Sequence, residues 1–136
     1  MTWSGPDVDV RSLAPEPFDA FDVVLAALPG AAPPRPLELA RRRISMLLAG
    51  AADALPAVGP LDASVVDSLS RWPTSPLFDA TDRAVLEVTE QFVIDVAGTS
   101  DELRGRCFGP LGALAFPVVQ AVYTFDHGLR MRAGLR

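Results

Sequence analysis

Apolar residues recur at helical spacing along most of the chain, and residues 72–98 are the clearest case. There a proline-containing loop leads into an amphipathic segment whose apolar side chains share one face of a helix. This stripe consists of Val85, Val88, Phe92, Val93 and Val96. Asp79 or Thr81 can cap the start of the helix, and Gly98 follows its end. We therefore expect a core-facing helix here.

The same spacing predicts further helices and no strand, since no segment alternates with period two. They are expected over 18–28, 37–55, 61–72, 100–106 and 111–133. Residues 1–17, rich in Pro, Asp and Ser, are expected to form an extended arm, which leaves 18–136 as a single domain. Gly109-Pro110 should open the last helix and Pro117 should kink it. The predicted fold class is all-α, with about six helices.

The last predicted helix is apolar on two sides. Its main stripe consists of Leu111, Leu114, Val118, Val122, Phe125 and Leu129. On the opposite side, Phe116, Tyr123 and His127 lie on one line, with Gln120 beside them. A helix with two apolar faces is usually sandwiched within the fold or between subunits, so we expect a homo-oligomer.

Composition limits the classes of partner. The chain has 136 residues, nearly half of them hydrophobic, which suits one domain with a real core. Its net charge is −5, and its longest basic run is Arg41-Arg42-Arg43, which we interpret as a solvated helix face. This balance argues against binding to nucleic acid or to an anionic membrane surface. Without a leader pattern or an apolar run of ~20 residues, a cytoplasmic protein with no membrane span is expected.

The single cysteine and single histidine exclude several kinds of site. Cys107 alone cannot form an intramolecular disulfide, a CxxC centre or a multi-cysteine zinc site, and we expect no metal and no cofactor. Arg104 and Arg106 could lower the pKa of Cys107 and make it a redox sensor, but a buried structural cysteine is the favoured interpretation. Glycine-rich phosphate loops and the GxSxG elbow are absent.

Two places can carry chemistry. Glu38, Arg42, Ser45, Ala49 and Ala52 follow one shoulder of the 37–55 helix, where small residues leave room for a ligand. Glu38 and Arg42 can pair at i, i+4. A carboxylate beside an apolar pocket can have a raised pKa and act as a general acid or base. From spacing alone, an ordinary surface ion pair is the favoured alternative.

The second place is His127, which could shuttle protons near neutral pH. Its neighbours on the helix face are Phe116, Gln120 and Tyr123. On such a mixed face, a packed and hydrogen-bonded interface histidine is the competing interpretation.

Three runs resemble the carboxymuconolactone decarboxylase superfamily, and most closely its alkylhydroperoxidase-D-like branch. They are LELARRRIS at 37–45, LSRWPTSPLF at 69–78 and AVLEVTE at 84–90. The resemblance covers about 18–135. It implies an all-helical fold that assembles into trimers, hexamers or related oligomers such as dimers.

The peroxidases of that superfamily carry the pattern E-x11-C-x2-C-x3-H. Glu38 matches its glutamate, but the two cysteine positions fall on Gly50 and Asp53 and the histidine position falls on Ala57. The thiol nucleophile, the resolving thiol and the relay histidine are all missing. We therefore do not expect a thiol peroxidase.

The superfamily also contains decarboxylases that need no cysteine. The resemblance therefore implies a cysteine-free acid–base enzyme, of the lyase, isomerase or cyclase type, acting on a small molecule in a pocket around Glu38. The catalytic candidates are Glu38, Arg42, Asp53 and His127, and the substrate-binding candidates are Ser45, Ala49, Glu90 and Tyr123. Arg42 would be the partner of Glu38 or a clamp for a substrate carboxylate. The alternative is a non-catalytic relative that binds a ligand or forms oligomers.

Overall fold

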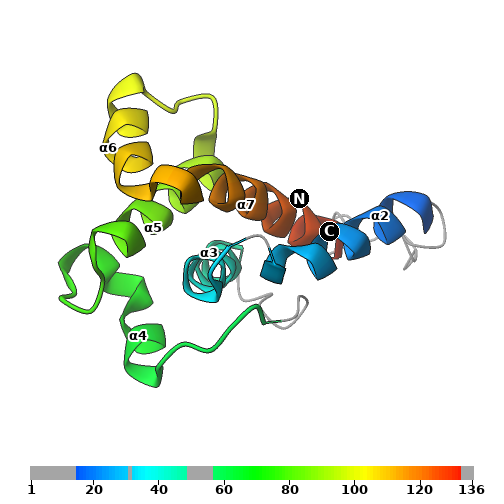
Figure 1. Cartoon of the computed structure of the whole chain (residues 1–136), viewed down its shortest axis with the longest axis horizontal. Coiled ribbons are helices and arrows are strands. Elements are labelled where there is room, and N and C mark those ends of the chain that lie inside the picture. Colours follow the sequence, from blue (N-terminus) through cyan, green and yellow to red (C-terminus); the bar gives the residue numbers. More distant parts are fainter. Residues whose placement is uncertain (1–14, 31, 49–56, 133–136) are drawn as a thin grey trace, which may run out of the picture.

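The computed structural model describes residues 15–30, 32–48 and 57–132, and all regular structure within them is helical (Figure 1). The elements in order are α2 (Pro15–Ala27), η1 (Leu28–Gly30), α3 (Pro34–Leu47), α4 (Ala63–Ser68), η3 (Leu69–Thr74), α5 (Ala80–Asp95), α6 (Asp101–Leu111), η4 (Gly112–Leu114) and α7 (Ala115–Arg132). The predicted all-α class is confirmed for the described residues.

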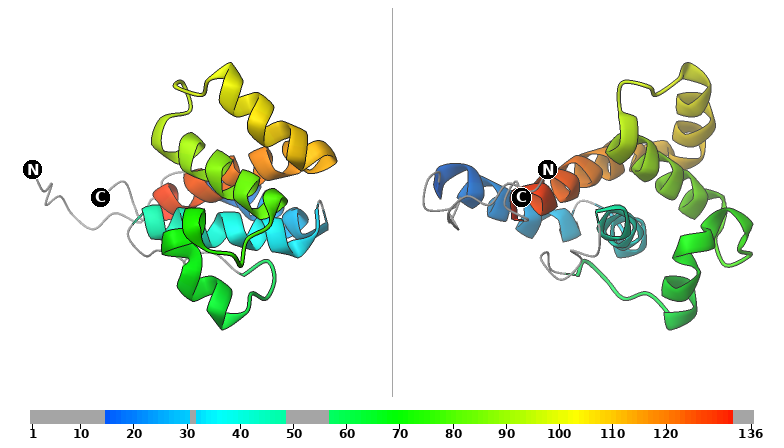
Figure 2. Two further views of the ribbon diagram at one scale, coloured as in Figure 1. Left: turned by 90° about the vertical axis from the view of Figure 1, so that its left-hand side faces the viewer. Right: turned by 180° about the vertical axis from the view of Figure 1, so that it is seen from behind.

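Helix α3 lies at the centre of the packing. It contacts both α5 and α7, while α2 packs on α7 and α6 packs on α5. Figure 2 (left) shows α3 along its length beneath α5, and in Figure 1 α2 and the end of α7 extend together to one side. Most of the large, fully buried apolar side chains come from α3, α5 and α7, with Leu69 of η3 beside them: Leu37, Leu39, Ile44, Val85, Leu86, Val88, Val118, Val122 and Phe125. Burying each contributes about 1.5–3 kcal/mol relative to exposure.

Among the side chains that the structure describes, the predicted core stripes are confirmed except at the end of α5, and Leu129 lies outside those side chains. Val85 and Val88 are buried and Phe92 is half-buried, but Val96 is 43% exposed. Val96 is the C-cap of α5 and lies one residue beyond the end of the helix.

Helix α5 begins with a capping box that also holds α3. The Asp79 carboxylate accepts from the backbone N–H of Asp82 at 2.8 Å, and the Asp82 carboxylate accepts from that of Asp79 at 3.2 Å. Asp79, not Thr81, is therefore the cap, and the pair satisfies two donors that the helix leaves unbonded. Arg35 of α3 adds a two-pronged contact to Asp82, at 3.1 and 2.9 Å.

The loop between η3 and α5 is held by one arginine. The guanidinium of Arg83 donates to the carbonyl oxygens of Pro73, Ser75 and Phe78 at 2.8, 2.5 and 3.1 Å. Prolines at 73 and 76 prevent regular backbone pairing in this stretch, so a side chain supplies the donors.

The predicted boundaries of α2 and α3 differ from those in the structure. Residues 15–17 belong to α2 and not to an extended arm, and 1–14 lie outside the described residues. Helix α3 ends at Leu47, with Leu48 as its C-cap, and the predicted end at Leu55 falls outside the described residues. Residues 49–56 also lie outside the described residues.

The break between the last two helices is at Gly112 and not at Gly109-Pro110. Helix α6 continues through Pro110 to Leu111, and Gly112 has φ of +53°, a backbone conformation that other residues adopt only with strain. Pro117 lies in the first turn of α7, where its missing N–H would have no partner in the helix. The predicted kink therefore has no physical basis.

By length and composition, the stretch Asp101–Gly128 could cross a membrane, and 28% of its apolar window is buried in this fold. Gly112 interrupts the stretch, and α5 packs against both of its halves.

Candidate functional site

Glu38 lies in the interior of the described fold, with none of its surface exposed. Its carboxylate accepts from Arg41 at 2.5 and 2.9 Å, from Arg42 at 3.2 Å and from the backbone N–H of Val58 at 2.8 Å. A carboxylate offers about four lone-pair positions, so these four donors engage its accepting capacity. Glu38 thereby joins α3 to the chain that leads into α4.

These contacts reverse the expected change in the Glu38 pKa. Burial by itself raises the pKa, but the hydrogen bonds from Arg41, Val58 and Arg42 and the positive charge of Arg41 outweigh it. The pKa of Glu38 is therefore lowered from its ordinary value, and the expectation of a raised pKa is wrong. A carboxylate held in this way stays ionised near neutral pH.

The Glu38–Arg42 pair forms as the spacing allows, but it is not the ordinary surface ion pair that was favoured, because Glu38 is buried, and the closer partner is Arg41. The interpretation of the arginine triplet as a solvated face is wrong for two of its members. Arg41 is 3% exposed, and the Arg43 side chain is 16% exposed and pairs with Glu90. Arg42 alone is substantially exposed, with 39% of its side-chain surface open.

Glu90 joins three elements. Its carboxylate accepts from Trp72 Nε1 of η3 at 2.7 Å and from Arg43 Nε of α3 at 2.8 Å. The Glu90 side chain is 27% exposed and Trp72 is buried. This arrangement gives Glu90 a structural partner on each side, so its place near a substrate stays a prediction.

The remaining candidates on the α3 shoulder do not form a described cavity. Ser45 is buried, with 2% of its surface exposed. Ala49 and Asp53 lie outside the described residues. The predicted pocket around Glu38 therefore gains no support from the residues that the structure describes.

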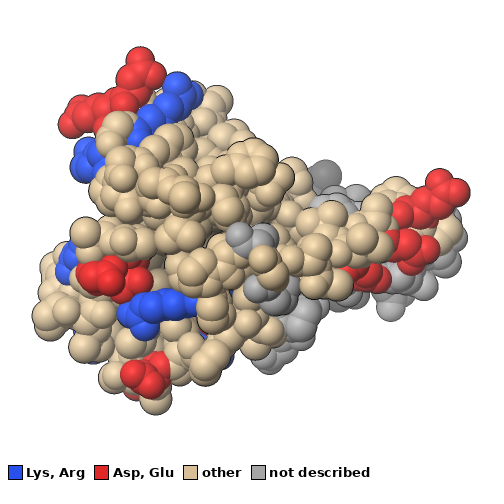
Figure 3. Space-filling model, in the orientation of Figure 1, with Lys and Arg blue, Asp and Glu red and all other residues tan. Residues whose placement is uncertain are grey.

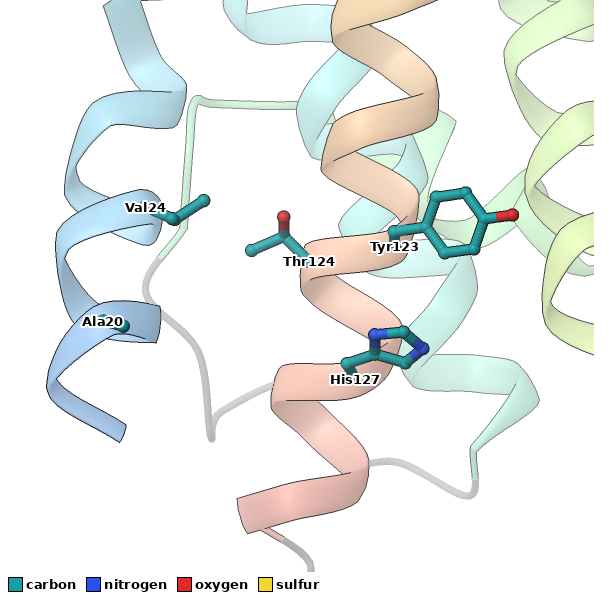
Figure 4. A pocket seen from close by; sticks show the side chains of 5 residues that line it. All are labelled: Ala20, Val24, Tyr123, Thr124 and His127. Atoms are coloured by element: carbon teal, nitrogen blue, oxygen red, sulfur yellow. The ribbon is translucent and has the colours of Figure 1, made fainter. Parts of the chain in front are cut away.

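A pocket of about 250 Å³ does occur, between α2 and α7 (Figure 4). It is lined by Ala20 and Val24 of α2 and by Tyr123, Thr124 and His127 of α7. Val24 and Thr124 point toward one another, while Tyr123 and His127 project from a shared side of α7. The structure thus brings together two of the predicted site residues, Tyr123 and His127.

The aromatic rings at this pocket contact one another. The ring centroids of Tyr123 and His127 are 5.9 Å apart, and Tyr123 lies 5.7 Å from Phe92 of α5. Tyr123 is 39% exposed and His127 is also exposed. Thr124 Oγ1 donates to the Gln120 carbonyl at 2.8 Å and keeps acceptor capacity toward a ligand, as Tyr123 and His127 do.

The α2 side of this pocket was missed from the sequence. Ala20 and Val24 are spaced i, i+4, which places them on one face of a helix, but their contact with α7 depends on tertiary packing. The i, i+4 spacing of these two small apolar residues was the only feature of the sequence that could have indicated a shared surface on this helix.

Cys107 is a buried, protonated thiol. Its Sγ lies 3.5 Å from Glu87 Oε2. Burial and the Glu87 carboxylate raise the Cys107 pKa to about 11, and the opposing effect of Arg106 is smaller, because Arg106 itself pairs with Glu87. The favoured interpretation of Cys107 as a buried cysteine is confirmed, and the alternative in which nearby arginines lower its pKa is contradicted.

No group of three or more His, Cys, Asp or Glu side chains in the described part of the chain could hold a metal ion.

The comparisons with known proteins add no relative. No family model matches the chain, and no curated protein or solved structure is similar enough to be matched. The resemblance to the carboxymuconolactone decarboxylase superfamily therefore stays a prediction, carried only by the three runs quoted above.

Proposed function

We propose that this protein binds a small molecule in the α2–α7 pocket and is not an enzyme centred on Glu38. The observation that carries the proposal is the contrast between the α2–α7 pocket and the surroundings of Glu38. The pocket has apolar walls with two exposed polar rings, whereas the Glu38 carboxylate is buried and engaged by four donors. This corresponds to the ligand-binding alternative derived from the sequence.

The pocket favours a small and largely apolar ligand. Its volume of about 250 Å³ is just below the usual range for pockets that hold drug-sized molecules, so a single ring or a short aliphatic chain fits best. Ala20 and Val24 offer apolar contact. Thr124 Oγ1 lies between α2 and α7 and can accept from a hydroxyl group of the ligand, while the polar ends of Tyr123 and His127 point away from α2 (Figure 4).

The charge of α2 disfavours an anionic ligand. This helix carries Glu16, Asp19 and Asp22 and no basic residue, and Figure 3 shows acidic side chains gathered on its protruding end. The residues that line the pocket include no Arg or Lys that could pair with a carboxylate or phosphate. A neutral aromatic alcohol, ketone or lactone is the class that we propose.

Acid–base catalysis at this same pocket is the second candidate, and the ring contact between Tyr123 and His127 favours it. Histidine accepts and releases protons near neutral pH, and a tyrosine beside it can orient a substrate oxygen. Catalysis would appear as consumption of a bound compound that depends on His127. Binding alone would leave the compound intact.

The proposal is tested by a thermal-shift screen of neutral one-ring compounds. The wild type is compared with Ala20→Leu, which fills the pocket, and with Ala26→Leu, an exposed substitution on α2 away from its lining. A compound at ten times its Kd stabilises by about 1.4 kcal/mol, or about 3–6 °C in Tm. We expect this shift in the wild type and in Ala26→Leu, and its loss in Ala20→Leu.

The screen overturns the proposal if no compound raises the Tm of the wild type. It also does so if Ala20→Leu responds as strongly as Ala26→Leu, because binding would then lie elsewhere. Circular dichroism of all three proteins checks that the helical content is equal.

A further inference from the structure

We infer that the α2–α7 pocket selects alcohols over ketones and lactones of the same shape, and that Thr124 makes the selection. The inference rests on the proposed function, in which this pocket is the ligand site, and it narrows the ligand class proposed above. The reason is the direction of one hydrogen bond, because it leaves Thr124 able to accept from a ligand but not to donate to it.

Thr124 is the polar residue of the pocket that faces α2. In Figure 4 its side chain lies between α2 and α7 and points toward Val24, whereas the rings of Tyr123 and His127 project from another side of α7. Ala20 and Val24 form the opposite wall and have no polar side-chain atom. Among the described lining residues, a ligand between the two helices therefore meets one polar side-chain atom, Thr124 Oγ1.

The proton of the Thr124 hydroxyl is already engaged. A threonine hydroxyl has one proton to donate and two lone pairs that accept. Thr124 Oγ1 donates to the carbonyl oxygen of Gln120, one turn earlier on α7, at 2.8 Å. This is an ordinary O–H···O distance, and helical threonines bond in this way to the carbonyl four residues back. The hydroxyl therefore presents lone pairs, and no proton, to the pocket.

A ligand hydroxyl and a ligand carbonyl consequently interact differently with Thr124. A hydroxyl can donate its proton to Oγ1 while the bond to Gln120 stays in place, so the complex gains a hydrogen bond. A carbonyl group has no proton to donate. It can accept from Oγ1 only if Thr124 releases Gln120, which exchanges one hydrogen bond for another. Without that exchange, two acceptors face one another and both lose hydrogen bonds to water.

The lining restricts the ligand's donor to a neutral group. An ammonium group also donates protons, but the residues that line the pocket include no Asp or Glu to pair with it. Moving an ammonium group out of water without a counter-charge costs more than a single hydrogen bond to a neutral oxygen returns. An alcohol or a phenol carries its donor without a charge, so a hydroxyl compound fits this lining best.

The expected preference is modest because Thr124 is only partly buried. Sites that enclose a group built to bond a substrate hydroxyl reject the analogue without it by about 10⁴–10⁵. A hydrogen bond at a partly exposed position contributes far less. We expect about a tenfold difference in Kd, which corresponds to about 1.4 kcal/mol.

A matched pair of ligands tests the preference. 1-Phenylethanol and acetophenone have the same carbon skeleton, and the first carries a hydroxyl where the second carries a carbonyl oxygen. Their Kd values are measured by NMR titration of the full chain, for wild type, Thr124→Val and Thr124→Ser. Valine has nearly the shape of threonine without the hydroxyl, whereas serine keeps the hydroxyl and can keep its bond to Gln120. Circular dichroism checks that the helical content of the three proteins is equal.

Wild type should bind 1-phenylethanol about tenfold more tightly than acetophenone, and Thr124→Ser should keep this preference. In Thr124→Val the two Kd values should lie within about twofold of each other, mainly because the alcohol binds more weakly. Equal Kd values in wild type would overturn the inference, and this comparison depends on neither variant. A preference for the alcohol that persists in Thr124→Val would also overturn it, because another residue would then make the selection.

Ala20→Leu, which fills the pocket, separates failure of the inference from failure of the proposed function. If Ala20→Leu abolishes binding but wild type shows no preference for the alcohol, the inference fails and the proposed function stands. If Ala20→Leu binds both compounds as wild type does, the ligand lies outside the pocket and both fail. If neither compound binds wild type saturably, the inference fails, and the wider thermal-shift screen decides the proposed function.

Discussion

Arg41 and Glu38, one turn apart on α3, form a two-pronged ion pair inside the fold, with N–O distances of 2.5 and 2.9 Å. Both residues are almost fully inaccessible. Because Val58 and Arg42 donate to the same carboxylate, the pair also holds the chain that follows residue 56. Glu38 thus acts in the described fold as a structural anchor.

Glu38→Gln should destabilise the protein by about 3–5 kcal/mol, because it leaves the buried Arg41 guanidinium without its counter-charge. Urea unfolding followed by circular dichroism measures the change. Glu102→Gln is the control, since the Glu102 side chain is 88% exposed and its loss should cost no more than about 0.5 kcal/mol. A stable, folded Glu38→Gln protein that had lost a catalytic activity would revive the enzyme hypothesis.

The pH dependence of stability should report the same ion pair. The folded-state pKa of Glu38 lies below its ordinary value of 4.5, so Glu38 contributes stability that is complete above pH 4.5. That contribution is lost as the pH falls through the lower, folded-state pKa. Wild type should therefore lose more stability than Glu38→Gln between neutral pH and pH 3 in parallel urea titrations. Parallel curves for the two proteins would contradict the lowered pKa.

Cys107 should react slowly with thiol reagents in the native protein. Its pKa is raised to about 11, so almost none of the reactive thiolate is present at pH 7.5, and the side chain is buried. Labelling with iodoacetamide, followed by mass spectrometry, should be far faster in 6 M guanidinium than in buffer. Equal rates in the two conditions would show that the thiol is accessible in the native state.

Two glycines, one inside α6 and one at its C-cap, should respond to alanine in opposite directions. Gly112 has φ of +53°, so Gly112→Ala should cost about 1–2 kcal/mol. Gly105 lies inside α6, and a Cβ there would have no atom within 4 Å, so Gly105→Ala should stabilise by about 0.5–1 kcal/mol. Thermal unfolding of the two variants and the wild type measures both changes: the Tm should fall in Gly112→Ala and rise in Gly105→Ala. Stabilisation by Gly112→Ala would contradict the left-handed conformation.

Helical periodicity predicted much of the fold because it reports which side of a segment meets the core. The stripes Val85–Val88 and Val118–Val122–Phe125 were correct for this reason. It failed at Pro110, since a proline in the last turn of a helix removes one hydrogen bond without ending the helix. The true break depends on the backbone angle of Gly112, which spacing does not encode.

The candidate site was predicted in part. The sequence predicted that Tyr123 and His127 lie close together, because residues four apart on one helix are neighbours on its surface. The contribution of Ala20 and Val24 depends on how α2 docks on α7, and that is a tertiary contact. Arg41 was missed as a buried partner because consecutive arginines resemble a solvated surface until their neighbours are known.

Successive residues of a helix point about 100° apart, so the three arginines at 41–43 face three directions. Arg41 faces inward to Glu38, and the partly exposed Arg42 contacts the same carboxylate from the solvent side. Arg43 faces Glu90 of α5. Turning α3 by one residue about its own axis would break these ion pairs together and bring a guanidinium into apolar surroundings. The triplet therefore fixes the rotational setting of the central helix, which apolar packing alone would specify less sharply.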